Sequence, residues 1–427
     1  MDTIFAVSSG RPPAAIAVIR ISGARAMDAG RAIAGTLPVD RRAGMRRLRD
    51  ASGGTLDHGL VLAFEAGGSV TGEDLVELHC HGGRAVIAAV ETALAAMPGL
   101  RRAEPGEFTR RALVHGRIDL AEAEGLADLL EAETETQRRS ALMAAEGQVS
   151  RAIRGWMADL SGLAARVEAS LDFADEADVG DDADGLADIV AEAHALAATI
   201  AAVAAAPAVD RLRDGISVVI GGPPNSGKST LLNRLIERDA AIVSPVSGTT
   251  RDRIDAPVVR QGIAYLVTDT AGLTDRTEDV VEQIGVVRAG EAIGAADILL
   301  WLADDPPPRA DALWLHARAD LPGRGLPQGG QHLVVSEHDP QSLTTLWEAI
   351  EDRARHVLPA LDALPLKRRQ QQLCQAAAAE LETITTRDPL IVAEHLRCAR
   401  VPLAGLVGDD ATETMLDALF GRFCIGK

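Results

Sequence analysis

The pattern of apolar and polar positions changes character along the chain. Short apolar runs rich in β-branched residues predict strands, at residues 14–22, 60–64 and 75–81. Beyond Asp119, a proline-free stretch rich in alanine, leucine and glutamate has apolar residues at helical spacing, which predicts long helices. A second helical run covers residues 183–206. The pattern therefore predicts a small mixed α/β domain followed by a helical region.

After the second helical run, strand signals return. The segment ISVVIGG predicts a strand, and others are predicted at residues 263–268, 298–303 and 332–336, with helices between them. This alternation is typical of an α/β domain with a largely parallel sheet. From Leu366 the chain is helical again. We therefore expect a helical domain in two sequence-distant parts, with an α/β domain inserted between them.

The predicted fold class is thus multidomain, α/β plus α. A chain of 427 residues is long enough for two or three domains. We place the boundaries so that residues 1–118 form the mixed α/β domain, 119–213 the first helical part, 214–358 the inserted α/β domain and 359–427 the second helical part.

Composition restricts the class of protein. Apolar residues make up 47% of the chain, yet no apolar run approaches the roughly 18 residues that span a bilayer. No export signal is visible at the N-terminus. We therefore expect a soluble, cytoplasmic protein without membrane contact. Four widely spaced cysteines fit a reducing compartment. The net charge of -19 argues against broad electrostatic binding of nucleic acid, so any RNA contact must be local or shared with a partner.

A phosphate-binding loop follows the strand ISVVI. The segment Gly222–Ser229 fits G-x-x-x-x-G-K-[ST] and precedes the helical run STLLNRLI. In such loops backbone N–H groups surround the phosphates, Lys228 reaches the terminal phosphates, and the Ser229 hydroxyl binds Mg²⁺. The alternative, a chance glycine-rich turn, is disfavoured because the chain has only three lysines.

Two further segments complete a predicted nucleotide site. The sequence DTAG at residues 269–272 follows a strand, which places Asp269 where it can hold Mg²⁺ through water and the Gly272 amide near a γ-phosphate. The segment GTTRD at residues 248–252 is a candidate switch loop, in which a threonine hydroxyl completes the Mg²⁺ shell only with the γ-phosphate present. The chain is therefore expected to bind and hydrolyse a nucleoside triphosphate.

The base-recognition motif departs from the usual Asn-Lys-x-Asp of GTPases. The corresponding residues are Ala317, Arg318, Ala319 and Asp320. Asp320 can still accept from the two guanine N–H groups, and Arg318 can stack on the purine through its guanidinium plane. Preference for GTP is expected, with affinity and selectivity open.

These motifs, read with both ends of the chain, resemble the tRNA uridine-modification GTPase family called MnmE or TrmE. The N-terminal segments that carry the resemblance are DTIFAVSSGRPPAAIAVIRISG, TGEDLVELHCHGG and PGEFTRRALVHGRIDLAEAEGLADLL. The central segments are PNSGKSTLLNRL, SPVSGTTRD, DTAGL and VEQIG, and the C-terminal one is FCIGK.

The resemblance implies a cytoplasmic homodimer that dimerises through the N-terminal domain. It would join an FAD-dependent partner of the MnmG (GidA) family in a heterotetramer or larger assembly. The pair would modify C5 of the wobble uridine of certain tRNAs to (carboxymethyl)aminomethyluridine, with the carbon supplied by a tetrahydrofolate derivative (5,10-methylene or 5-formyl). GTP hydrolysis would open and close the two G domains.

The resemblance also implies a folate site formed by Arg20, Glu77, Arg117 and Lys427. The chemistry agrees, because pterin N–H groups favour a carboxylate and a folate tail favours cations. For each residue the alternative is a solvated surface charge, or for Lys427 a frayed terminus. Cys424 is either a reactive thiol or a structural cysteine. The sequence His79-Cys80-His81 places both histidines on one side of a strand without further metal ligands, and we interpret it as structural.

For hydrolysis, the resemblance points to Glu282 in VEQIG, because Leu273 occupies the position of the water-orienting glutamine of Ras-like proteins. Glu282 would act through a bridging water, with Lys228 as the second catalytic residue; its alternative is an exposed helix charge. Asn225 resembles a potassium ligand, and K⁺ would supply the charge of a missing arginine finger once G domains dimerise.

The implied ligand sets are as follows. Mg²⁺ would be held by Ser229 and Thr250, and K⁺ by Asn225, Ser244, Val246 and Thr249. The residues expected to bind GTP are Asn225, Ser226, Gly227, Lys228, Ser229, Thr230, Ser244, Pro245, Val246, Ser247, Gly248, Thr249, Thr250, Asp269, Thr270, Ala271, Gly272 and Asp320.

Two other readings stay open at this point. The chain could be a nucleotide-sensing or scaffold protein whose altered base motif permits binding without useful turnover. It could also be a ribosome-assembly GTPase, although such proteins are not expected to carry the folate-domain signatures or FCIGK.

Overall fold

The computed structural model describes residues 2–172, 183–239, 255–270, 288–319, 333–336, 339–360, 362–408 and 412–426. The chain forms two compact units, which we describe separately. The first unit comprises Met1–Ala127, Ala144–Gly162 and Arg400–Lys427, and the second comprises Asp128–Met143 and Leu163–Ala399.

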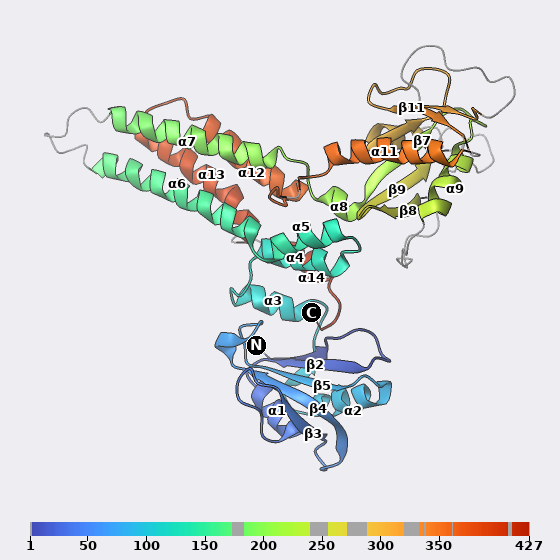
Figure 1. The fold of residues 1–427 in the computed structure, drawn as a ribbon. Coiled ribbons are helices and arrows are strands. Elements are labelled where there is room, and N and C mark those ends of the chain that lie inside the picture. The colour runs from blue at the N-terminus through green and yellow to red at the C-terminus, as the bar shows by residue number, and fades with distance from the viewer. Residues whose placement is uncertain are drawn as a thin grey trace. The chain divides into compact units, whose positions relative to one another are not determined.

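The first unit is built on a six-stranded sheet (Figure 1). Its strands are β1 (Thr3–Val7), β2 (Ile16–Ser22), β3 (Gly44–Arg49), β4 (Thr55–Phe64), β5 (Leu75–His81) and β6 (Leu100–Arg102), in the order β3-β4-β5-β2-β1-β6. Only the β1–β6 pair is parallel. Along β2 and β5 buried and more accessible side chains alternate, as expected for strands with one face in a core.

Helices cover the two faces of this sheet unequally. The helices of this region are α1 (Ala26–Ala34), η1 (Ala66–Gly68), α2 (Arg84–Ala95) and α3 (Glu107–Val114). Residues of α1 and α2 pack with Ile19, Ile21 and Leu78 on one face. On the other face Phe108 of α3 packs with Ile4 and Ala6 near one end of the sheet. The rest of this second face carries the polar residues of β2 and β5.

The C-terminal segment of the chain returns to the first unit. Leu419, Phe420 and Phe423 of helix α14 (Glu413–Phe420) and the tail pack with Leu120 and Ala123 of helix α4 (Leu120–Glu131). Beyond them, Ile425 forms an isolated bridge with Pro105. The tail thereby reaches the N-terminal sheet.

The remaining helices of this part of the chain range from 5 to 25 residues. They are α5 (Glu135–Ala145), α6 (Gln148–Asp172), α7 (Ala183–Ala204), α8 (Asp210–Asp214), α12 (Arg368–Glu382) and α13 (Pro389–Val407). In the second unit α7 lies along α12 (Figure 1). Ile189, Ala193 and Ile200 of α7 and Cys374 and Leu381 of α12 are buried there. Segments separated by about 180 residues of sequence thus build one helical layer.

Helix α7 also departs from one expectation. Within the described residues, Gly185–Ala204 is long and apolar enough to cross a membrane, with a mean hydropathy of 1.6, although no apolar run of that length was expected. The reason is its alanine content, which raises hydropathy without large apolar side chains. One side of the helix is covered by α12.

The second sheet lies in the second unit. Its strands are β7 (Ile216–Gly221), β8 (Asp255–Arg260), β9 (Ile263–Asp269), β10 (Ile298–Trp301), β11 (Leu313–Ala317) and β12 (Leu333–Val335), in the order β12-β11-β10-β7-β9-β8. All pairs are parallel except β8–β9. Helices α9 (Lys228–Asp239) and α11 (Pro340–Val357) contribute Leu231, Leu235, Leu346 and Trp347 to its core.

This architecture confirms the predicted fold class. An N-terminal mixed sheet, helices from both halves of the chain, and a separate, largely parallel sheet are all present.

Candidate functional site

The phosphate-binding loop connects the central strand β7 to helix α9. Because β7 lies between β9 and β10, its carboxyl end opens where ligands bind in parallel α/β sheets. Gly222 has φ 147°, and a Cβ there would lie 2.4 Å from the Leu302 carbonyl oxygen, so only glycine fits. The Lys228 ammonium is buried and donates to the carbonyls of Gly222 at 3.0 Å and Pro223 at 2.8 Å. The lysine is therefore held within the loop.

An oxygen pair suited to Mg²⁺ lies beside this lysine. The Ser229 hydroxyl donates to Asp269 Oδ2 at 2.6 Å, which brings the start of α9 next to the end of β9. The parallel register between β7 and β9 places Asp269 opposite Ile220, one residue before the end of β7. Hydroxyl and carboxylate oxygens are ligands that Mg²⁺ prefers, directly or through water. The fit of this donor set to a Mg²⁺–nucleotide is good.

Two residues of the phosphate-binding loop have a backbone angle or a side-chain environment that fits a bound ligand. Asn225 has φ 61°, in the left-handed region that asparagine tolerates better than most residues. The neighbouring Ser226 hydroxyl is buried and has no hydrogen-bond partner among the residues that the structure describes. Buried polar atoms are almost always satisfied, so an unsatisfied hydroxyl in a phosphate loop is consistent with a partner supplied by a ligand.

The altered base-recognition motif begins where β11 ends, at Ala317. Arg318 follows with φ 59°, and its Nε would lie 3.6 Å from a Cβ placed on Gly227. The guanidinium group therefore lies beside the phosphate loop. The connection from β10 to β11 contains no helix between residues 302 and 312. It is held in place by Arg309, which donates hydrogen bonds to the Ile293 and Ala296 carbonyls.

Several predicted nucleotide residues lie outside the described part of the chain. They are Ser244, Pro245, Val246, Ser247, Gly248, Thr249, Thr250, Ala271, Gly272, Leu273, Glu282 and Asp320. Those described, from Asn225 to Thr230 with Asp269 and Thr270, come together at one edge of the sheet, where Thr270 donates to the Ile220 carbonyl.

A second polar cluster lies on the N-terminal sheet, with Glu77 at its centre. Glu77 Oε1 accepts two hydrogen bonds from Arg20, at 3.0 Å from Nε and 2.9 Å from Nη2. The Arg20 guanidinium also lies 5.8 Å from the centre of the Phe108 ring. Burial alone would raise the pKa of Glu77, but the hydrogen bond from His79 and the charge and hydrogen bond of Arg20 outweigh it, so the pKa is lowered.

His79 belongs to this cluster, which the sequence did not reveal. Its Nε2 lies 3.1 Å from Glu77 Oε2. Residues 77 and 79 share a sheet face, and that periodicity was a usable signal. His81 lies two residues further on the same face and pairs with Asp57 instead, at 2.8 Å from Nδ1 to Oδ1.

The other residues of the expected folate site are distributed around this pair. Arg117 follows α3, and its Cγ would lie 3.3 Å from a Cβ on Gly72; within the described chain it has no ion pair with Glu77. Gly426 packs so closely on the end of β1 that a Cβ would lie 2.1 Å from the Val7 carbonyl oxygen. Lys427 lies outside the described residues. Its neighbour Gly426 lies close to β1, in which Ala6 is paired with Arg20 of β2. Cys424 is exposed.

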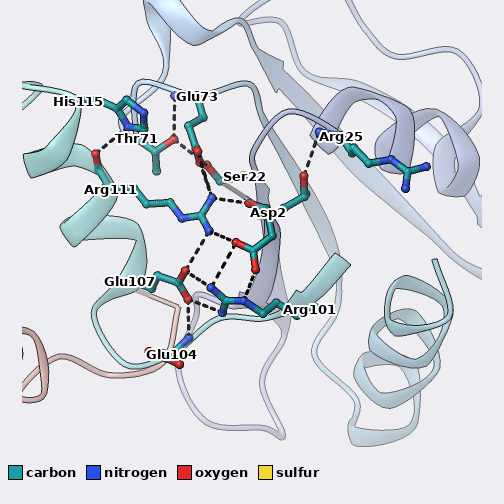
Figure 2. Close-up of polar contacts among 11 residues, drawn as sticks. Asp2, Ser22, Arg25, Thr71, Glu73, Arg101, Glu104, Glu107, Arg111 and His115 are labelled. Atoms are coloured by element: carbon teal, nitrogen blue, oxygen red, sulfur yellow. Dashed lines mark hydrogen bonds and ion pairs between the residues drawn. The ribbon is translucent and has the colours of Figure 1, made fainter. Parts of the chain in front are cut away.

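A buried ion network holds the elements around this cluster together (Figure 2). Arg111 of α3, only 4% exposed, donates to Glu73, Glu107, the Asp2 carboxylate and the Asp2 carbonyl. Arg101 bridges Asp2 and Glu107 from the other side. Burial alone would raise the pKa of Glu107, but the hydrogen bonds from Arg101, the Glu104 N–H and Arg111 lower it overall. The network joins α3 to β1, β6 and the loop before β5.

Known protein families match the chain from near one end to the other. The family described as GTP-binding protein TrmE N-terminus matches residues 3–117, and the MnmE helical domain matches residues 120–424. The tRNA modification GTPase MnmE of Erythrobacter litoralis is 50% identical over 429 residues, covering 100% of both chains. That of Rhizorhabdus wittichii is 50% identical, covering 100% of this chain and 97% of the relative.

Among solved structures, the G domain of the T. maritima FeoB iron transporter is 19% identical, covers 34% of this chain and 99% of its own, and has a TM-score of 0.23. A likeness of that size supports no argument.

Proposed function

The chain belongs to the family of tRNA modification GTPases called MnmE or TrmE, and from this membership we propose how its parts act. As a member, it is a hydrolase of GTP in tRNA modification and uses GTP with Mg²⁺. We propose that it works in the cytoplasm as a homodimer with an FAD-dependent protein of the MnmG (GidA) family. Together they would convert C5 of the wobble uridine of certain tRNAs to (carboxymethyl)aminomethyluridine.

The observation that best supports the nucleotide half of this proposal is the contact between Ser229 and Asp269 beside the buried Lys228. We propose that Ser229, with Thr250, holds Mg²⁺ and that Asp269 orients its water. Lys228 would exchange its bonds to loop carbonyls for phosphate oxygens, since a charge-assisted bond to phosphate is stronger than one to a carbonyl. Arg318 would lie over the purine and Asp320 would select guanine.

For turnover, we propose that Glu282 positions the attacking water and that K⁺ neutralises developing charge. Asn225, with Ser244, Val246 and Thr249, would hold the cation. Since these loops close when two G domains meet, hydrolysis should depend on dimerisation as well as on K⁺.

The folate half of the proposal rests on the Arg20–Glu77 pair. Glu77 is held in the charged form by Arg20, so it can accept from the donor edge of a pterin. Arg117 and Lys427 would bind the folate tail carboxylates. We propose domain boundaries after residues 118, 213 and 358. The folate site would then combine residues of the first domain, 1–118, with Lys427 of the last.

The first experiment is steady-state hydrolysis of GTP by the full chain in matched KCl and NaCl, with ATP as a control. We expect strong K⁺ stimulation and preference for GTP. Asn225→Gly keeps the positive φ without the amide side chain, so it should bind GTP normally and lose K⁺ stimulation. Glu282→Gln should lower turnover without changing GTP affinity.

Equal rates in Na⁺ and K⁺ would contradict the cation proposal alone. Equal turnover of ATP would mean that the change at Ala317 has altered the site. Unchanged turnover by Glu282→Gln would favour a different water-positioning residue.

A further inference from the structure

A strongly basic segment lies at the edge of the N-terminal sheet, although the chain as a whole carries a net charge of -19. Residues 41–49 comprise β3 and the loop before it, and β3 is the outermost strand on one side of the sheet (Figure 1). Five of these nine residues are arginines. Arg46 is half-buried and the other four are exposed. We call the exposed four, Arg41, Arg42, Arg47 and Arg49, the basic edge.

The positive charges of this segment are not neutralised by acidic side chains. Within the part of the chain that the structure describes, none of the five arginines forms an ion pair, and three of them donate to uncharged acceptors. These contacts join Arg41 to the Gly68 carbonyl at 3.2 Å, Arg46 to the Thr36 carbonyl at 2.6 Å and Arg47 to His58 Nε2 at 3.1 Å. The guanidinium groups of the basic edge therefore present unpaired charge to solvent.

The two aspartates that flank the segment do not pair with it either. Asp40 Oδ1 accepts from the Glu65 N–H at 3.0 Å. Asp50 Oδ1 accepts from the Ser52 and Gly54 N–H groups at 2.9 and 2.8 Å. Both carboxylates thus bind loop backbone instead of a guanidinium group. Even counted with them the segment is positive, with five arginines against two aspartates.

The basic edge shares a face of the sheet with the candidate folate site. Met45 of β3 is paired with Leu60 of β4, and Leu60 with His79 of β5, so these side chains lie on one face. Because side chains alternate along a strand, Arg47 and Glu77 project from that same face. Only β4 separates β3 from β5, a lateral distance of about 10 Å. A ligand held by the basic edge would therefore lie near the site proposed for the folate.

Protection of a sheet edge explains the arginine pattern only in part. Charged side chains on an edge strand discourage its pairing with a second chain. Arg41 and Arg42, however, precede β3, whose first residue is Gly44, so they do not guard the exposed backbone of the strand. Clustered, unpaired guanidinium groups are instead suited to a polyanion, because each can bind a phosphate through two parallel hydrogen bonds.

We propose that the basic edge binds the phosphate backbone of tRNA. This inference rests on the proposed function in tRNA modification. Contacts of this kind hold and orient an RNA without reading its sequence. They give an acidic chain the local RNA contact that its net charge otherwise disfavours, and they bring the RNA to the sheet face that would carry the folate.

The test is filter binding of tRNA over a series of salt concentrations, with the full chain alone and in complex with its MnmG-family partner. The variant combines Arg41→Gln, Arg42→Gln, Arg47→Gln and Arg49→Gln. Each lost phosphate contact lowers the slope of log affinity against log salt by about 0.7–0.9, so the slope of the complex should fall by about 3. The chain alone should lose most of its slope. Thermal unfolding and GTP hydrolysis of the variant should match the unmodified protein.

A matched control removes the same number of positive charges elsewhere. It combines Arg138→Gln, Arg139→Gln, Arg166→Gln and Arg397→Gln, four exposed arginines that form ion pairs with Glu135, Glu192 and Glu394. Its slope should stay near that of the unmodified protein. An equal fall in both variants would mean that net charge alone sets the affinity, and the basic edge would then not be a binding surface.

Chemical modification provides a measurement that needs no variant. In the unmodified complex, bound tRNA should protect the four arginines of the basic edge from p-hydroxyphenylglyoxal, as read by mass spectrometry, and should leave Arg138 and Arg139 reactive. Unchanged reactivity of the basic edge would contradict the proposal even if the fourfold variant failed to fold.

The remaining outcomes separate this inference from the function on which it rests. If the chain and its partner bind no tRNA, alone or together, the proposed function fails and the surface with it. If they bind tRNA and the fourfold variant keeps the slope, the function stands and the surface is wrong. If the variant no longer joins the partner in size-exclusion chromatography while the chain alone keeps its slope, the basic edge contacts a protein and the proposal is overturned.

Discussion

Arg111 joins several elements of the N-terminal unit through ion pairs. It is almost fully buried and satisfies Glu73, Glu107 and Asp2 at once. Its removal takes the arginine away from Glu73, whereas Asp2 and Glu107 keep Arg101, and loss of one partner of a buried ion pair costs about 3–5 kcal/mol. We therefore expect Arg111→Met to lower the local unfolding free energy of α3 by about that amount.

Hydrogen–deuterium exchange of amides in α3 and β1 measures this effect without assuming that the whole chain unfolds in one step. Arg102→Met is the control, because its pair with Glu91 is 66% exposed on the arginine side and such pairs contribute about 0–1 kcal/mol. Equal effects of the two substitutions would show that the network contributes no more than a surface pair.

Paired carboxylates in this network and in the Glu77 cluster give the N-terminal unit a defined acid sensitivity. The pKa values of Asp2, Glu77 and Glu107 are all lowered in the folded chain, from ordinary values of 3.8 for Asp and 4.5 for Glu. Carboxylates of this kind contribute stability that is complete above their ordinary pKa and is lost as pH falls through the lowered value. Stability of this unit should therefore hold down to about pH 4.5 and fall below it.

Calorimetric unfolding at a series of pH values checks this, and Arg111→Met provides the comparison. Without Arg111 the folded-state pKa values of Asp2 and Glu107 move back toward those of the unfolded chain, so the stability of the variant should depend less on acid pH. A steeper dependence in the variant would contradict the assignment.

At the scale of elements, the sequence predicted best where apolar periodicity was strong. The run at residues 75–81 coincides with β5, and the predicted helix from Ala183 with α7. Strand β3 was missed because it is an edge strand with the sequence GMRRLR, in which Leu48 is the buried residue and arginines take the place of an apolar run. Strand β11, at residues 313–317, was not among the predicted strands, and His316 is the polar residue in its otherwise apolar sequence LWLHA.

The break between α4 and α5 is marked in the sequence by a helix cap, and the break between α5 and α6 by Gly147, which has φ 79°. Thr134 and Gln137 form a capping box, in which the Gln137 side chain accepts from the Thr134 N–H and the Thr134 hydroxyl accepts from the Gln137 N–H. Asp119 and Glu122 do the same at the start of α4. Composition alone predicted one continuous helical stretch where the structure has three helices.

The residues of the candidate sites also differ in how well the sequence predicted their contacts. Ser229 and Asp269 were predictable because a short motif fixes a loop between a strand and a helix. The contact of Glu77 with Arg20 was predictable only through the family resemblance, because it depends on pairing between strands 57 residues apart. Strand periodicity places His79 on the same face as Glu77, whereas the contacts of Arg111 depend on neighbours that no local pattern specifies.

The helical layer provides a test of packing between distant segments. Leu381 of α12 is fully buried, whereas Leu390 of α13 is 67% exposed. Leu381→Ala should lower the unfolding free energy by about 2–5 kcal/mol, and Leu390→Ala should change it by less than about 0.5 kcal/mol. Urea denaturation followed by far-ultraviolet circular dichroism measures both. A small effect at Leu381 would mean that the contact between α7 and α12 contributes little.

At the scale of the whole molecule, charge constrains how tRNA is bound. The chain carries 62 acidic and 43 basic residues, and phosphate contacts dominate the affinity of proteins for nucleic acid. Each neutralised phosphate adds about 0.7–0.9 to the slope of log affinity against log salt, so a protein that makes few such contacts binds weakly and with a shallow slope.

We expect this chain alone to show both properties, and the MnmG-family partner or the complex of the two to bind tightly with a steep slope. Filter binding of each protein alone and of the complex, over a series of salt concentrations, separates the contributions. Tight binding by this chain alone with a steep slope would instead require a local basic surface strong enough to overcome a net charge of -19.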